Sequence, residues 1–129
     1  MTMTLIQKEN LRFLCDLQES LRLNNKNRIN TDDIVYLQSD WNYTHVHTID
    51  NRKILSSFTL KILEKRIFDK DFIRINRGSL VNIRRISTIK DNGKVGEATM
   101  YNGSVLPISR RKLNTVKRVF ESSASVVLR

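Results

Sequence analysis

The segment Phe72-Ile73-Arg74-Ile75-Asn76-Arg77-Gly78-Ser79-Leu80-Val81-Asn82 places two short apolar runs on either side of a polar tetrapeptide. Both runs are rich in β-branched residues, which favour buried strands. The tetrapeptide Asn76-Arg77-Gly78-Ser79 has one glycine and no bulky apolar side chain, a composition typical of a loop. The sequence therefore predicts two strands that hold a loop between them and direct Asn76 and Arg77 outward. Because asparagine can bind the edge of adenine and arginine that of guanine, this loop is a candidate base-reading site.

The basic residues are concentrated around this segment. The formal net charge is +10, from 23 lysines and arginines against 13 aspartates and glutamates. Residues 72–118 hold 11 basic and 2 acidic residues, whereas residues 1–71 hold 11 and 10. An excess of positive charge in so short a segment favours binding to a polyanion, with nucleic acid as the first candidate and an acidic membrane surface as the second. The alternative is a basic face that serves only solubility.

Length and composition predict one cytoplasmic domain. A chain of 129 residues is long enough to bury its own core. The single cysteine, Cys15, cannot form an internal disulfide, and its apolar neighbours favour a buried thiol over a reactive one. The amino terminus has no signal-peptide pattern, and no apolar run approaches the ~18 residues of a membrane span.

The first half of the chain predicts mainly hairpins. Residues 4–20 fit a short helix, although alternating apolar positions also fit a strand. The asparagines of Asn24-Asn25-Lys26-Asn27 predict a turn between strands at 21–23 and 28–30. Further strands are expected at 34–37, 43–49 and 54–56. Apolar residues at helical spacing then predict a helix over 58–68, with Ser57 or Thr59 as its cap.

The second half predicts five more strands and a closing helix. The strands are expected at 72–75, 80–83, 86–89 and 95–101, and a further short strand is expected at 104–106. Pro107 indicates that this last strand is an edge strand or is ending. Asn102-Gly103 predicts a type I′ turn. Ser109 is the expected cap of a helix over 110–121, and residues 122–129 are expected to fray. The fold class is thus mostly β with antiparallel hairpins and two or three helices.

The sequence contains no catalytic or metal-binding pattern. It has no nucleophile beside a base, no paired carboxylates and no phosphate-binding glycine loop, so we expect neither an enzyme nor a cofactor. His45 and His47 share a strand face with Tyr43, but a third ligand at useful spacing is missing, so no metal is expected. Trp41 could stack on a base, but a tryptophan in a turn more often covers the core.

Three loops are candidate contacts for nucleic acid: Asn42-Tyr43, Asn76-Arg77 and Ser109-Arg110-Arg111. Each adjoins an apolar strand and offers an amide or a guanidinium group. A helix that begins at Ser109 would also present free backbone N–H groups to phosphate, with Arg110 and Arg111 adding full charges. Whether these two arginines contact bases or the backbone stays open.

Four ordered motifs carry a family resemblance. They are Asp33-Ile34-Val35-Tyr36-Leu37-Gln38-Ser39-Asp40-Trp41-Asn42-Tyr43, Thr59-Leu60-Lys61-Ile62-Leu63-Glu64, Phe72-Ile73-Arg74-Ile75-Asn76-Arg77 with Leu80-Val81-Asn82, and Asn102-Gly103 with Leu106-Pro107-Ile108-Ser109-Arg110-Arg111. In order and spacing they resemble the LytTR DNA-binding domain of bacterial response regulators, over about residues 21–120.

The resemblance implies an elongated β sandwich of stacked antiparallel sheets that binds double-stranded DNA. In that family, loops at one edge enter successive major grooves of promoter direct repeats, often as a homodimer on DNA. Carried over by position, the contacts fall at Asn42, Tyr43, Asn76 and Arg77, and at Arg110-Arg111. The expected organisation is an N-terminal extension over 1–20, the DNA-binding domain over 21–121 and a flexible tail over 122–129.

Two departures from the family pattern bear on function. The family commonly has histidine at Asn76 and an aromatic residue at Ser79, so the base preference of this loop is expected to differ. Only about twenty residues precede the first matching strand, too few for a phospho-accepting receiver. We therefore expect a transcriptional regulator without a receiver, related to two-component systems.

Three other functions stay open from the sequence. A non-specific DNA- or RNA-binding protein would use the same charges without regard to base sequence. A dedicated RNA-binding module would need exposed aromatic residues on a sheet face, for which Tyr43 and Tyr101 are available. A protein-interaction domain would need a substantial apolar patch in place of the basic one.

Overall fold

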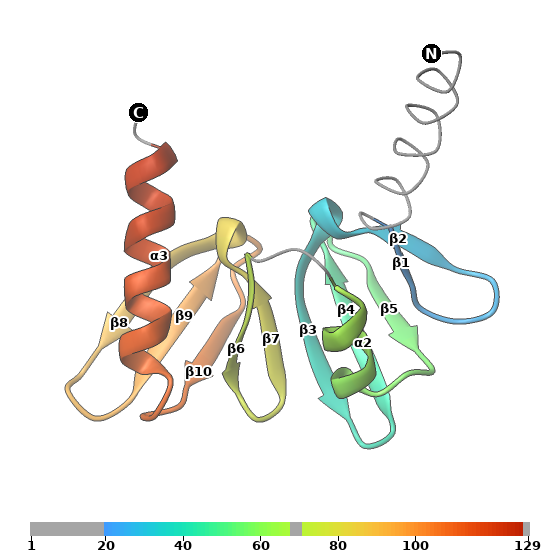
Figure 1. Cartoon of the computed structure of the whole chain (residues 1–129), viewed down its shortest axis with the longest axis horizontal. Helices are drawn as coiled ribbons and strands as arrows, with labels where there is room; N and C mark the ends of the chain where they lie inside the picture. The colour runs from blue at the N-terminus through green and yellow to red at the C-terminus, as the bar shows by residue number, and fades with distance from the viewer. Residues whose placement is uncertain (1–19, 68–70, 128–129) are drawn as a thin grey trace, which may run out of the picture.

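The computed structural model describes residues 20–67 and 71–127 and consists of three antiparallel sheets and two α-helices (Figure 1). The strands are β1 Ser20–Arg22, β2 Arg28–Asn30, β3 Ile34–Asp40, β4 Tyr43–Thr48, β5 Lys53–Ser56, β6 Phe72–Asn76, β7 Ser79–Asn82, β8 Ile86–Asp91, β9 Gly96–Met100 and β10 Val105–Ile108. The helices are α2 Leu60–Arg66 and α3 Leu113–Val127, and two 3-10 turns are η1 Thr31–Asp33 and η2 Ile83–Arg85. The predicted mostly-β fold with stacked antiparallel sheets is confirmed.

The sheets are arranged along the long axis of the molecule (Figure 1). The central sheet has the strand order β5-β4-β3-β7-β6. The hairpin β1-β2 and helix α2 lie at one end, and the sheet β10-β9-β8 with helix α3 lies at the other. The antiparallel pairing of strands that are neighbours in sequence follows from their short connections, which cannot join parallel strands.

Strand β3 is shared by two hydrophobic cores. Ile34 and Leu37 belong to the core under α2, whereas Val35 and Tyr36 belong to the core under α3. All four side chains are buried, and β3 pairs with β4 on one side and β7 on the other. This explains the unbroken apolar run 34–37, since the part of a central strand that is covered on both faces has no solvent-facing positions.

Helix α2 is shorter than predicted and is capped by Thr59. The Thr59 hydroxyl accepts a hydrogen bond from the Ile62 N–H at 3.3 Å, which satisfies one free donor of the first turn. Leu60 and Leu63 are the buried residues of this helix. The apolar stripe predicted from their spacing therefore packs against the core.

The predicted start and end of the last helix are wrong. The Ser109 N–H donates to the Ile75 carbonyl at 2.8 Å, and the Ser109 carbonyl accepts from Lys112 N–H at 3.0 Å. These bonds hold residues 109–112 in a turn beside β6, so α3 begins at Leu113 and Ser109 does not cap it. The helix continues as far as Val127, through residues that we expected to fray.

The turn at Asn102-Gly103 is not the predicted type I′. That turn needs positive φ at both central residues, but in this loop only Gly103 has it, with φ 90°. The Gly103 N–H bonds to the Met100 carbonyl at 2.9 Å, and the Met100 N–H bonds to the Ser104 carbonyl at 2.8 Å. The connection is a three-residue loop with glycine in the left-handed position. It leads into β10, which is an edge strand as Pro107 predicted.

Two sequence predictions concern residues that are not described. The short helix over 4–20 and the burial of Cys15 lie outside residues 20–67 and 71–127, apart from Ser20, which is in β1. Within the described part of the chain, neither α2 nor α3 is long and apolar enough to cross a membrane.

Candidate nucleic-acid interface

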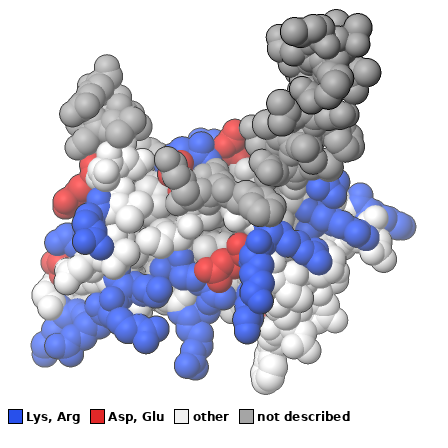
Figure 2. Space-filling view, in the orientation of Figure 1, with Lys and Arg blue, Asp and Glu red and all other residues white. Residues whose placement is uncertain are grey.

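The three predicted contact loops lie along one edge of the molecule. The β3-β4 turn, the β6-β7 turn and the segment between β10 and α3 all project from the lower edge in Figure 1, spread along the long axis. Arginine and lysine side chains gather along the same edge (Figure 2). Segments far apart in the sequence thus form one surface with a positive middle and an end, at the β3-β4 turn, that has no lysine or arginine.

The middle of this edge is built around the side-chain amide of Asn76. Its oxygen accepts a hydrogen bond from the Gly78 N–H at 2.8 Å and so closes the β6-β7 turn. Its nitrogen donates to the Pro107 carbonyl at 2.6 Å. Together with the bond from Ser109 N–H to Ile75, this links the β6-β7 turn to the segment before α3. Both polar atoms of the Asn76 side chain therefore form hydrogen bonds within the chain.

An open groove of about 540 Å³ lies between these two linked segments. Its lining consists of Arg74, Asn76, Arg77, Ser109, Arg111 and Lys112. The side chains of Arg77 and Arg111 are exposed, and neither has a hydrogen-bond or ion-pair partner within residues 20–67 and 71–127. Arg74, by contrast, bonds to Glu64 at 3.0 Å and to the Arg77 carbonyl. The groove thus has a fixed arginine at its base and free guanidinium groups at its rim.

Arg110 and Ser109 occupy the turn before α3 in different ways. Arg110 is exposed and, in the described part of the chain, its side chain is free of hydrogen bonds and ion pairs. Ser109 is half-buried, with its backbone engaged by Ile75 and Lys112. Lys112, which the sequence analysis did not single out, also lines the groove. The run of three basic residues Arg110-Arg111-Lys112 is the sequence feature that indicates this role for Lys112.

The β3-β4 turn presents aromatic and amide groups at the end of the edge. Asp40 pairs with Tyr43, so Trp41 and Asn42 alone form the connection. Trp41 is 94% exposed and Tyr43 is 50% exposed. The expectation that Trp41 covers the core is therefore wrong. Asp40 accepts a bond from His45 at 2.9 Å, which directs that carboxylate along the strand.

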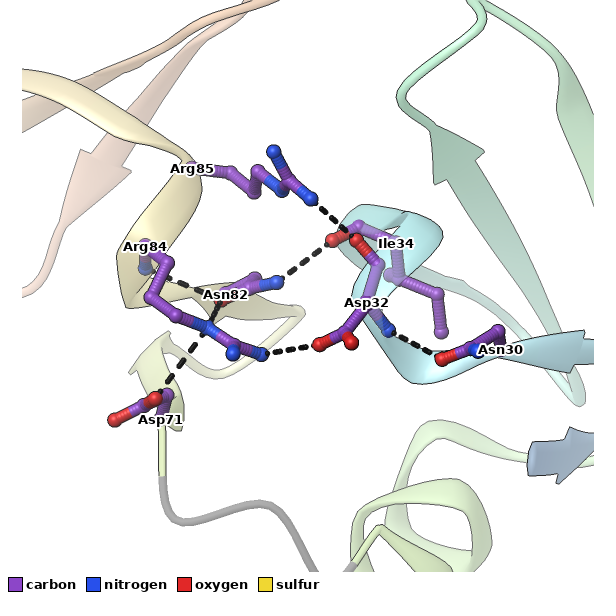
Figure 3. Close-up of polar contacts among 7 residues, drawn as sticks. All are labelled: Asn30, Asp32, Ile34, Asp71, Asn82, Arg84 and Arg85. Atoms are coloured by element: carbon purple, nitrogen blue, oxygen red, sulfur yellow. Dashed lines mark hydrogen bonds and ion pairs between the residues drawn. The ribbon is translucent and has the colours of Figure 1, made fainter. Parts of the chain in front are cut away.

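Two arginines of the basic third of the chain are engaged elsewhere. Figure 3 shows Arg84 and Arg85 of η2 bonded to η1, at the edge opposite the loops. Arg84 contacts Asp32 at 2.9 Å and Asp71 at 3.3 Å, and Arg85 donates to the Asp32 carbonyl at 2.6 Å. The charge count from sequence therefore overstates the positive charge of the loop edge.

The two histidines have separate structural roles. His47 stacks on Tyr36 with ring centroids 4.1 Å apart, and burial is the main factor that lowers the pKa of His47. Lys53 and His45 lower this pKa further, because nearby positive charge disfavours protonation. Among the described residues, no group of three or more histidine, cysteine or acidic side chains is placed to hold a metal ion.

Comparison with known proteins gives the family of this chain. The profile of the family described as LytTr DNA-binding domain matches residues 24–121. Sensory transduction protein LytT of Bacillus subtilis (strain 168) is 32% identical over 92 residues, which are 70% of this chain and 38% of LytT. Transcriptional regulatory protein BtsR of Escherichia coli (strain K12) is 30% identical over 87 residues, or 66% of this chain and 35% of BtsR. The chain spans little more than a third of the length of these relatives.

A solved structure shares the fold. It is the LytTr DNA-binding domain of a putative methyl-accepting/DNA response regulator from Bacillus cereus, with a TM-score of 0.64 and 21% sequence identity. The similarity covers 78% of this chain and 93% of that domain. Because the family profile spans more than half of the sequence and the fold agrees, this chain belongs to the LytTr DNA-binding domain family.

Proposed function

We propose that this protein regulates transcription by binding double-stranded DNA with sequence specificity through its loop edge. The supporting observation is the groove between the β6-β7 turn and the segment before α3, at whose rim Arg77 and Arg111 have no partner in the described chain. Guanidinium groups held on a rigid base can form bidentate bonds with guanine in the major groove, worth ~1–3 kcal/mol of discrimination each. The name of BtsR as a transcriptional regulatory protein agrees with this function.

Within this proposal the predicted site residues take different parts. Arg77 and Arg111 read bases, whereas Arg110 and Lys112 bind phosphates. Asn76 orients the two arginine-bearing segments, because its amide already bonds to Gly78 and Pro107. Asn42 and Tyr43 contact DNA at the far end of the edge.

The sites are proposed to be promoter direct repeats, each bound by one copy of the chain. The loops lie in a row along the long axis, so they can follow one face of a duplex (Figure 1). Two copies side by side require repeats a whole number of helical turns apart, and a turn is about 10–10.5 base pairs. Insertion of about five base pairs between repeats should therefore weaken cooperative binding, which analytical ultracentrifugation of protein–duplex mixtures can measure.

The proposal is tested by fluorescence anisotropy across a salt series. Duplexes from upstream of the protein's own gene and its neighbours are compared with scrambled duplexes. We expect one upstream duplex to bind more tightly, and Arg77→Ala or Arg111→Ala to remove its advantage. Arg52→Ala is the matched control, since it removes one charge at the β4-β5 turn on the opposite edge.

Equal binding of all duplexes would overturn sequence specificity. The affinity would then fall with salt at a slope of about −0.9 per phosphate contacted, as for a non-specific nucleic-acid-binding protein. A single-stranded RNA module is less well supported, because Tyr43 begins β4 at the loop edge, whereas Tyr101 lies in the β9-β10 turn at the opposite edge, so the two rings cannot form one stacking surface (Figure 1). Competition by single-stranded RNA tests that alternative directly.

A further inference from the structure

Trp41 occupies a conformation that its residue type disfavours. The β3-β4 hairpin closes with only Trp41 and Asn42 between the paired residues Asp40 and Tyr43. Trp41 has a φ of 57°, in the left-handed region where a side chain crowds the backbone and glycine is ordinarily found. Strained backbone of this kind is concentrated at binding sites and points to a function for the residue that bears it.

The fold gives no reason for a tryptophan at this position. Its side chain is 94% exposed, and its indole makes no hydrogen bond, ring contact or cation–π contact with any described residue. Exposure of so large an apolar group is unfavourable in water. Because so little of the side chain is covered, both faces of the indole are open, whereas Tyr43 beside it is half-covered.

The position of Trp41 relates it to the proposed DNA surface. The β3-β4 turn projects from the same edge as the arginine-bearing loops, and its two turn residues, Trp41 and Asn42, carry no charge (Figures 1 and 2). A ligand that spans this edge must offer negative charge to the groove and a flat apolar surface to the tip. Duplex DNA offers both, in its phosphates and its stacked bases.

We propose that Trp41 inserts its indole between two adjacent base pairs and so kinks the duplex at one end of the bound site. The proposal rests on the DNA binding proposed above. Apolar side chains that enter a base step unstack it, and the cost is lowest at the flexible pyrimidine–purine steps TA and CA/TG. The tip should therefore prefer such a step at a fixed distance from the bases read by Arg77.

Trp41 is the only tryptophan in the chain, so intrinsic fluorescence reports on this residue alone. The full chain is titrated with the duplex that binds most tightly in the anisotropy experiment. We expect its emission to be quenched by the stacked bases and its quenching by acrylamide to be suppressed. Affinity of Trp41→Gly for this duplex should fall about ten-fold or more, because stacking on a base is lost. Trp41→Phe should retain part of the wild-type affinity, because the phenyl ring can still stack.

Trp41→Gly separates DNA contact from folding. Glycine accepts positive φ without strain, so thermal unfolding of this variant should occur at the wild-type temperature or above it. Replacement of the flexible base step by a stiff one should weaken wild-type binding several-fold and leave Trp41→Gly unchanged. Measurement of duplex bending by energy transfer between end-labels should give a smaller bend with Trp41→Gly.

The failure of this inference differs from failure of the proposed function. If the upstream duplex binds specifically while Trp41 emission and acrylamide access stay unchanged, insertion is overturned and DNA binding stands. If emission changes with protein concentration in the absence of DNA, the tip contacts a second copy of the chain, and insertion is likewise overturned. If no duplex binds specifically in the anisotropy experiment, the proposed function has failed and insertion fails with it.

Discussion

The side-chain nitrogen of Asn76 donates a hydrogen bond to the main-chain oxygen of Pro107 at 2.6 Å, across 31 residues of sequence. The bond joins the β6-β7 turn to β10 directly before the arginine-bearing segment. A second bond, from Ser109 N–H to Ile75 at 2.8 Å, fixes the same two elements. The backbone segments that carry Arg77 and Arg111 therefore have a fixed relative position, which favours recognition of two nearby bases.

Asn76→Ala should reduce both stability and specific DNA affinity. It removes the bonds to Pro107 and Gly78, and a typical hydrogen bond contributes ~0.5–1.5 kcal/mol. Arg77→Ala removes an exposed side chain and should leave the free energy of unfolding within about 0.5 kcal/mol of wild type. Urea unfolding and anisotropy measure the two effects. Unchanged stability with lost affinity in Asn76→Ala would instead mean that this amide binds DNA directly.

Asn82→Leu should destabilise the protein by ~1–3 kcal/mol, the cost of leaving buried polar groups unpaired. Asn82 is fully buried, donates to the Ile34 carbonyl and accepts from the Arg84 N–H, both at 3.1 Å (Figure 3). It thereby joins β3 to η2, between the two cores. Asn114→Ala, at an exposed position on α3, is the control and should change urea unfolding little. Equal effects from the two variants would show that the Asn82 bonds contribute nothing net.

Gly96→Ala should move α3 away from the sheet. A Cβ at Gly96 would lie 2.4 Å from Leu113 Cδ1 and 3.0 Å from the Lys90 carbonyl, which the β8-β9 pairing holds in place. Overpacking of this kind costs ~1–3 kcal/mol, which urea unfolding can measure. Because Leu113 follows the Arg110-Arg111-Lys112 run directly, DNA affinity should fall too. When Gly96→Ala and Leu113→Ala are combined in one chain, the loss in free energy of unfolding should be smaller than the sum of the two single losses. A loss equal to that sum would exclude the clash as the cause.

Local patterns predicted most of the fold. Thr59 capped α2, the asparagine-rich turn joined β1 and β2, and Pro107 marked an edge strand. Each prediction depends on residues within a few positions of one another, where turn and capping preferences act. The two-sided burial of β3 also followed from its unbroken apolar run.

Two of the errors concern bonds between residues distant in sequence, and those at Trp41 and at Asn102-Gly103 concern the backbone of short turns. Ser109 has the chemistry of a cap, but its N–H bonds to Ile75 and the helix begins at Leu113. Arg84 and Arg85 counted toward the basic surface, yet Asp32 binds both of them at the opposite edge. The exposure of Trp41 depends on the backbone of a two-residue turn, which the composition of the stretch does not determine.

Stability should fall as the pH drops below about 6.5, the ordinary pKa of histidine, because of His47. Its pKa is lowered in the folded protein, where it stacks on Tyr36 and its Nε2 is buried without a partner in the described chain. Between the folded and unfolded pKa values the unfolded chain binds more protons, so falling pH favours unfolding. Above about pH 6.5 both states are neutral at this residue and the effect is absent.

His47→Phe should abolish this loss, because a phenyl ring keeps the stacking on Tyr36 and cannot be protonated. Urea unfolding at about pH 7.5 and pH 5.5 measures it. Asp50 and Asp91 have pKa values lowered from 3.8, so their titration lies below this range and does not interfere. His45→Asn is the control and should retain most of the loss, because burial is the main cause of the lowered His47 pKa and His45 is the smallest of the three contributions. The same pH dependence in His47→Phe as in wild type would place the responsible proton elsewhere.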